Sequence, residues 1–282
     1  MAASRKTLHF SPSSSSIALM PVYVRRFALR AALVAACLFP PVALATDFTD
    51  IWYSPAESGW GVNVVQSDSF LFVTFFIYGA DNKPTWYTAS LTWNGTLYAG
   101  NLYATQGTFW VNPWNTADHP AAQLVGSATF QPDAANAYQA TLVYAVNGTG
   151  SVVKAITRQT LTGIAIGGSY LGAQSGAYSG CSGAAPYSDK YSLAIAQSPA
   201  GDATLTFTYD SGAVCTMSGT LEQHGQLYQI NGAFYACTGS LNYTTTATLY
   251  ELKATALGFE GRLFAQLPGG CREDANFSAV LL

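Results

Sequence analysis

Hydrophobic and polar residues alternate along most of this chain with a period of two, as in strands that bury one face. The clearest run is Tyr138, Ala140, Leu142, Tyr144 and Val146, whose side chains would share one face of a strand. Such runs recur about every ten residues, with glycine, asparagine or proline between them. No segment keeps an apolar period of 3.6 residues. The pattern therefore predicts an all-β protein.

The predicted strands fall into two consecutive antiparallel meander units, each a small β-barrel or β-sandwich. The first set covers residues 60–66, 70–78, 85–93, 96–104, 123–130, 137–146 and 151–159. The second covers residues 168–173, 187–197, 203–209, 213–221, 226–234, 243–252, 257–264 and 277–282. Asn94-Gly95 and Asn147-Gly148 predict tight hairpins, because both central residues of a type I′ turn need a positive φ. Segment 70–78 is apolar on both faces apart from Thr74, so we expect it to be covered on both sides.

The first 45 residues have the pattern of a signal peptide. Arg25, Arg26 and Arg30 precede the short apolar run 31–39, and Ala43-Leu44-Ala45 matches a signal-peptidase site. Met20 would start a signal peptide of ordinary length and is an alternative start. We therefore expect a signal peptide over 1–45, an aromatic-rich β domain over 46–162 and a disulfide-bonded β domain over 163–282.

These features favour a secreted or periplasmic protein without a transmembrane helix, because the apolar run is shorter than the about 20 residues needed to span a bilayer. A lipoprotein attached through Cys37 is less favoured, since cleavage there would leave the apolar stub 38–44. An outer-membrane barrel fits the low charge and the alternating strands. It fits the expected disulfides less well.

Four cysteines follow the signal segment, and an even number in an exported chain predicts two disulfides. Cys215 and Cys237 flank an expected hairpin through His224-Gly225, whereas Cys181 and Cys271 lie near the start and end of the second unit. The predicted pairs are therefore Cys215–Cys237 and Cys181–Cys271. A zinc site is disfavoured because there is no Cys-x-x-Cys pair and histidine is scarce. We expect no metal and no cofactor.

Charge argues against nucleic acid as a partner. Residues 46–282 hold seven basic and 15 acidic side chains, a formal net charge of −8. A chain without a basic patch is poorly suited to bind a polyanion.

Aromatic residues give the strongest indication of a binding site. All six tryptophans lie between Trp52 and Trp114, in the first unit. Aromatic faces stack on the apolar faces of sugars, while nearby polar groups fix hydroxyls. Most of these rings are expected to fill the unit's core. Trp110 and Trp114 are different, because they flank a proline in a segment unlike a core strand. We expect them to form an exposed platform, with Trp60 and Glu57 as a second ligand-binding pair.

Catalytic motifs are missing from the sequence. There is no Gly-x-Ser-x-Gly segment, and His119 and His224 fall in expected loops. Two carboxylates at a fixed separation are enough for glycoside hydrolysis, and Glu57 with Asp50 is the best such pair. For Glu57 the favoured interpretation is nevertheless a carboxylate that accepts N–H groups of the Ser58-Gly59 turn.

Two motifs resemble those of a family of uncharacterised secreted β-rich proteins from proteobacteria. One joins Trp52-Tyr53-x-Pro55-x-Glu57-Ser58-Gly59-Trp60-Gly61-x-Asn63 with Ile156-Thr157-Arg158-Gln159. The other is Cys215-x-x-x-Gly219, followed by Gln223-x-Gly225, Gly232 and Cys237. The resemblance implies export and a β-rich fold. It implies no reaction.

The sequence thus favours an exported, non-catalytic binding protein. The expected partner is a glycan, another cell-envelope component or a surface protein, held on the aromatic surface of the first domain. Two alternatives remain open: a hydrolase of an extracellular polymer that uses paired carboxylates, and a structural or adhesive protein-interaction module.

Overall fold

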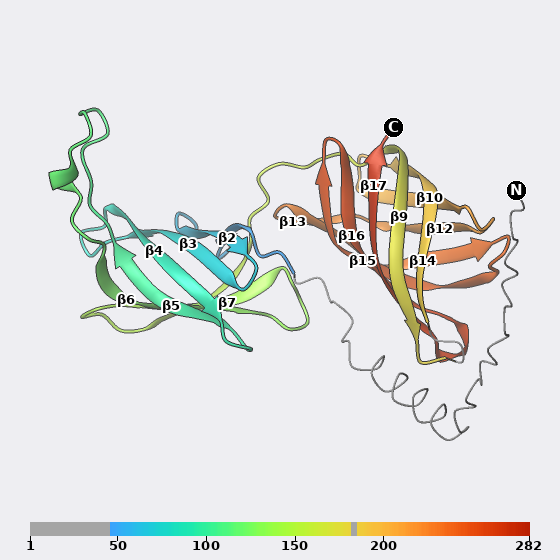
Figure 1. Ribbon diagram of the computed structural model, residues 1–282, viewed down its shortest axis with the longest axis horizontal. Helices are drawn as coiled ribbons and strands as arrows, with labels where there is room; N and C mark the ends of the chain where they lie inside the picture. The colour runs from blue at the N-terminus through green and yellow to red at the C-terminus, as the bar shows by residue number, and fades with distance from the viewer. Residues whose placement is uncertain (1–45, 182–184) are drawn as a thin grey trace, which may run out of the picture. The chain divides into compact units, whose positions relative to one another are not determined.

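The computed structural model describes residues 46–181 and 185–282. The expected signal segment lies outside these ranges. In the described residues the chain forms two consecutive antiparallel β-barrels (Figure 1), which confirms the predicted fold class.

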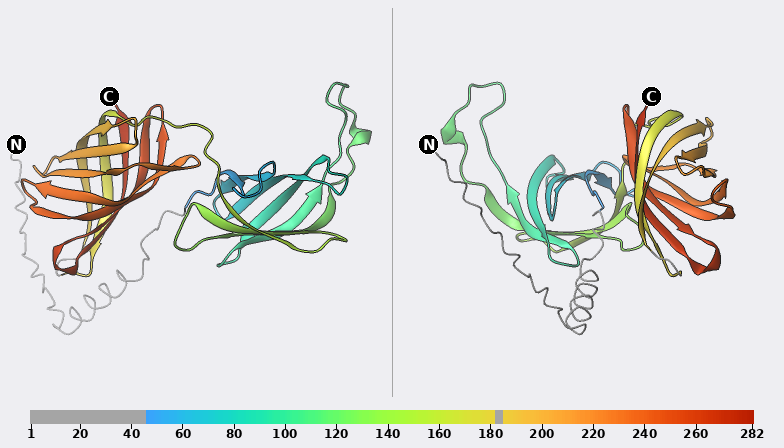
Figure 2. Two further views of the ribbon diagram at one scale, coloured as in Figure 1. Left: turned by 180° about the vertical axis from the view of Figure 1, so that it is seen from behind. Right: turned by 45° about the vertical axis from the view of Figure 1, so that its right-hand side comes forward.

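The first barrel is closed by eight strands in sequence order. They are β1 (Asp50–Tyr53), β2 (Gly61–Ser67), β3 (Phe70–Tyr78), β4 (Pro84–Trp93), β5 (Tyr98–Ala104), β6 (Gln123–Pro132), β7 (Gln139–Val146) and β8 (Val152–Arg158). Closure joins the first strand to the last, with Trp52 opposite Arg158 and Tyr53 opposite Thr157. The two views of Figure 2 show how the sheet of these strands curves round on itself.

The core of the first barrel contains the inward half of the alternating pattern. Its fully buried side chains include Trp52, Leu71, Phe75, Leu102 and Phe130. Hairpins form at both expected places, and Gly95 and Gly148 have positive φ, of 101° and 83°. The predicted type I′ turns are wrong, because Asn94 and Asn147 do not have positive φ and the strands are joined by the longer loops 94–97 and 147–151. Glycine reaches this region at no steric cost, which is why the chain reverses at these points.

The expectation that segment 70–78 is covered on both sides is wrong. Phe72 and Phe76 on the outer face of β3 are 42% and 52% exposed, and Trp86, opposite Phe76, is 53% exposed. A barrel buries only the inner face of each strand, and among the described residues no second layer packs over this outer face. Apolar residues on both faces did not indicate two-sided burial here.

The second barrel contains β9 (Gly168–Ser179), β10 (Pro186–Gln197), β11 (Asp202–Tyr209), β12 (Val214–Thr220), β14 (Leu227–Thr238), β15 (Tyr243–Thr255), β16 (Gly258–Gln266) and β17 (Arg272–Leu281). Pairing of β12 with β14 and of β17 with β9 closes it. The short strand β13 (Glu222–His224) forms a hairpin with the start of β14. The segment 159–167 joins the two barrels.

Both disulfides form as predicted. Cys215 and Cys237 face each other across β12 and β14, with their Cα atoms 4.0 Å apart. Cys181, just after β9, is bonded to Cys271, the residue before β17, with Cα atoms 4.8 Å apart.

Within the described ranges, no helix has the length and apolar character needed to cross a bilayer.

Candidate ligand-binding site

Four loops of the first barrel meet at one end. In an up-and-down barrel, alternate connections lie at the same end. This end therefore holds segments 54–60, 79–83, 105–122 and 147–151. The longest of them carries the short helix η1 (Thr116–Asp118) and extends well beyond the strands (Figure 1). Glu57, Trp60, Trp110 and Trp114, the residues predicted to bind a ligand, all belong to these loops.

A cavity of about 600 Å³ opens at this end. Several of its walls are partly buried side chains that pack on the core below, namely Trp60, Ile77, Tyr87, Tyr144 and Val146. Glu57, Lys154, Tyr78 and the backbone of Gly79 and Gly150 complete much of the rim. The floor is therefore apolar and aromatic, and the polar groups lie above it. This is the usual arrangement of a small-molecule site.

Three side chains at the rim form one polar unit. The Glu57 carboxylate accepts a hydrogen bond from the Trp60 indole Nε1 at 3.0 Å and pairs with the Lys154 Nζ at 2.6 Å. The Lys154 ammonium also lies 5.7 Å from the centre of the Trp60 ring. Lys154 is on the inner face of β8, so it reaches the rim from inside the barrel. The unit orients Trp60 and carries no net charge.

The Lys154 ammonium and the Trp60 N–H hold the pKa of Glu57 below its ordinary value, although partial desolvation opposes them. Glu57 is therefore ionised at neutral pH. The general acid of a glycosidase needs the opposite, a raised pKa that keeps its proton available. In this state Glu57 is suited to accepting hydrogen bonds and poorly suited to donating a proton.

The two loop tryptophans lie outside this cavity. Trp110 is 87% exposed and Trp114 is 73% exposed. Trp114 stacks on the His119 ring, with centroids 3.5 Å apart and an angle of 18° between the planes. His119 is in turn held by Thr108, whose hydroxyl lies 3.1 Å from its Nε2. The loop thus carries a supported flat surface at the same end as the cavity.

Asp50 lies at the other end of β1 and is not brought together with Glu57. It is buried and pairs with Arg158 at 3.3 Å. At about 3.3 Å per strand residue, the three steps along β1 from Asp50 to Tyr53 alone carry the backbone ~10 Å away from Asp50. The carboxyl groups of a glycosidase are about 5–9.5 Å apart. The structure therefore offers no support for this catalytic pair.

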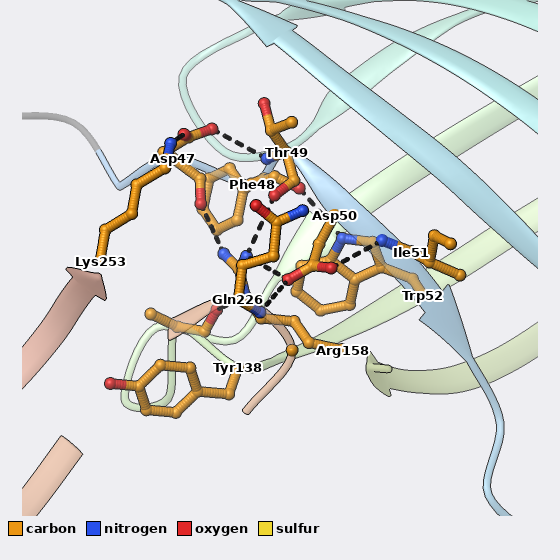
Figure 3. A network of polar contacts seen from close by, with 12 residues as sticks. Asp47, Phe48, Thr49, Asp50, Ile51, Trp52, Tyr138, Arg158, Gln226 and Lys253 are labelled. Carbon is orange, nitrogen blue, oxygen red and sulfur yellow. Dashed lines mark hydrogen bonds and ion pairs between the residues drawn. The ribbon is translucent and has the colours of Figure 1, made fainter. Parts of the chain in front are cut away.

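Figure 3 shows what Asp50 does instead. Residues Thr46–Leu282 form one compact unit. Within it, the second barrel supplies a hydrogen-bond donor to the Asp50 carboxylate of the Asp50–Arg158 ion pair. The backbone N–H of Gln226 donates to Asp50 Oδ2 at 2.9 Å. Gly225 has φ +65°, and a Cβ there would lie 2.1 Å from Asp50 Oδ2. Lys253 also reaches Asp47, at 3.0 Å. Asp50 and Arg158 thus anchor the first barrel to the β13–β14 hairpin.

A larger hollow, of about 830 Å³, is lined by residues of β6, β7 and β8 together with Pro55, Gly95 and Thr96. Its charged lining residue is Asp133, and the other side chains are small, aliphatic or amide. It therefore offers a ligand fewer specific contacts than the aromatic cavity.

Lys154, Tyr87 and Tyr144 line the cavity but were not predicted as site residues. Lys154 could have been recognised from its position in the sequence. It occupies an inward position of β8, two residues before the buried Ile156, and a basic residue at such a position needs a partner.

No protein-family model matches this chain, and no curated protein matches it. Among solved structures, the chain is similar to a candidate outer membrane protein of Bacteroides fragilis. The two share 12% sequence identity over 82% of this chain and 94% of that chain, with a TM-score of 0.32. So loose a likeness carries no functional argument.

Proposed function

We propose that this is an exported, non-catalytic binding protein that holds an uncharged glycan at the open end of its first barrel. The observation that carries the proposal is the Glu57–Lys154–Trp60 unit over an aromatic floor. The ion pair supplies hydrogen-bond donors and acceptors but no net charge. A polyhydroxylated neutral ligand uses both kinds of group, while the rings of Trp60, Tyr87 and Tyr144 contact its apolar faces.

Export is supported by the two disulfides, which persist in oxidising compartments. The signal-peptide pattern and the resemblance to secreted proteobacterial β-rich proteins point to the same compartment. Loop 105–122 extends the proposed site. In the proposal, Trp110 and Trp114 stack on parts of a longer ligand that project out of the cavity.

Replacing Trp60 with alanine should weaken binding at least about tenfold, because a central aromatic contact contributes about 2 kcal/mol or more. Binding is measured by calorimetry with soluble neutral oligosaccharides, including glucan, chitin and peptidoglycan fragments. Glu57→Gln should weaken binding as well. Trp86→Ala, on the outer face of β4, is the matched control and should leave the affinity unchanged.

The double substitution of Trp110 and Trp114 by alanine separates the loop from the cavity. It should weaken the binding of long oligosaccharides more than that of short ones. The proposed site would be contradicted if an oligosaccharide that binds the wild-type protein bound the Trp60→Ala variant with equal affinity.

A structural or adhesive role is the second candidate, and the exposed outer face of β3 and β4 favours it. Phe72, Phe76 and Trp86 form neighbouring exposed apolar contacts there. If light scattering shows the mass of a monomer only, and a glycan binds saturably, the first proposal is favoured over this one.

A further inference from the structure

The second barrel contains a small cavity lined by tyrosines at the end where both disulfides lie. Tyr178 and Tyr187 stack with centroids 4.7 Å apart, and Tyr235 meets Tyr243 edge-on at 6.1 Å. The cavity is lined by Gln174, Tyr178, Asp189, Tyr209, Ser211, Cys215, Tyr235, Leu241, Tyr243 and Glu273. Its volume is about 20 Å³, enough for one group the size of a water molecule.

A buried carboxylate forms the inner wall of this cavity. Glu273 is 2% exposed. One of its oxygens, Oε1, accepts a hydrogen bond from the Tyr187 hydroxyl. That hydroxyl accepts in turn from Gln174, whose Oε1 accepts from Tyr209 at 3.1 Å. The other carboxylate oxygen, Oε2, has no hydrogen-bond partner among the described residues. Since a buried polar atom without a partner is costly, Oε2 is the natural contact for a ligand.

The charged side chains that line the cavity are all acidic. Asp189 and Glu273 both line it, and the described lining includes no lysine or arginine. Burial raises the pKa of Glu273, although the hydrogen bond from Tyr187 opposes the shift. A bound cation would offset this desolvation and favour the ionised form of Glu273.

We propose that this cavity binds the ammonium group of a small primary amine. An –NH₃⁺ group is about the size of a water molecule, donates a hydrogen bond to Oε2 and interacts favourably with tyrosine rings. Tyr178, Tyr187 and Tyr243 are only partly buried and Leu241 is exposed, so the alkyl part can lie toward the opening. This site is separate from the glycan site and does not depend on it.

The test uses the protein with its disulfides intact at pH 8, where methylammonium remains protonated. Calorimetric unfolding is compared in methylammonium chloride and in sodium, potassium or tetramethylammonium chloride at equal ionic strength. Methylammonium at about tenfold excess over its Kd should raise the Tm by about 3–5 °C. The bulky tetramethylammonium ion should give no such rise, because it exceeds the cavity.

Glu273→Gln should abolish the methylammonium effect. Asp274→Asn is the matched control, because Asp274 lies next to Glu273 on the outer face of β17 and pairs with Arg262 at 3.5 Å. It should retain the effect. If Glu273→Gln fails to fold, the comparison of salts on the wild-type protein still decides the question. Equal stabilisation by potassium or tetramethylammonium, no rise with methylammonium, or an unchanged rise in Glu273→Gln would overturn the proposal.

Discussion

Replacing Arg158 with alanine should lower the free energy of unfolding by about 3–5 kcal/mol, which is typical when one partner of a buried ion pair is removed. Its guanidinium pairs with Asp50, donates to the carbonyl oxygens of Asp47 at 2.5 Å and Ala137 at 3.3 Å, and lies 4.8 Å from the centre of the Trp52 ring. The substitution would leave the buried Asp50 carboxylate without its counter-charge and those carbonyl groups without their donor.

Urea unfolding followed by tryptophan emission measures this loss, because all six tryptophans lie in the first barrel. Lys154→Ala is the matched control on the same strand. Its ion pair with Glu57 is exposed to solvent, so its removal should cost much less stability than the removal of Arg158. Adding Asp50→Asn to Arg158→Ala should restore part of the stability, since the unpaired charge is then gone. A loss below about 1 kcal/mol for Arg158→Ala would show that the network contributes little.

Removing the Cys181–Cys271 disulfide by a double substitution to alanine should cost about 4–5 kcal/mol. The bridge spans 90 residues of sequence, and the loop-closure entropy that it removes from the unfolded chain grows with that length. The same relation gives about 3–4 kcal/mol for Cys215–Cys237, whose separation is 22. Cys215 and Cys237 are also buried in the core, so their removal adds a packing loss.

Hydrogen exchange of the backbone amides in strands β9–β17 at increasing urea concentration follows the second barrel. Each double variant is compared with the intact protein under non-reducing conditions. A change of less than about 1 kcal/mol on loss of Cys181–Cys271 would mean that the unfolded chain is already constrained in other ways.

Most of the fold was predictable from the alternation of apolar and polar residues and from the turn glycines. The cysteine pairing was predictable because hairpin geometry brought Cys215 and Cys237 together. Strand β1 was missed, because four residues are too few to show a period of two.

The strands of the second barrel were predicted too short at the disulfide end. The expected segments 168–173, 226–234 and 277–282 omit the parts of β9, β14 and β17 that hold Gln174, Tyr235 and Glu273. Inward-facing polar groups interrupt the apolar alternation at Gln174 and Glu273. Both of these polar residues line the proposed ammonium site, so the break in the alternation coincides with that site.

The proposed site of the first barrel was predictable in part. The segment containing Glu57 and Trp60 could be recognised from its residues, and the exposure of Trp110 and Trp114 agrees with a loop platform. Lys154 could not be placed beside Glu57, because that contact depends on the closure that sets β1 against β8. The same closure sets Arg158 against Asp50 at the opposite end of these strands.

The most direct test of a glycan site at the open end of the first barrel follows the six tryptophan indole N–H signals by ¹⁵N NMR during a titration with neutral oligosaccharides. We expect a saturable shift of the Trp60 signal, because its N–H donates to Glu57 at the rim. The buried Trp52 and the outer-face Trp86 should remain unchanged. Shifts confined to Trp86, or no shift with any oligosaccharide, would contradict a glycan site at this end of the barrel.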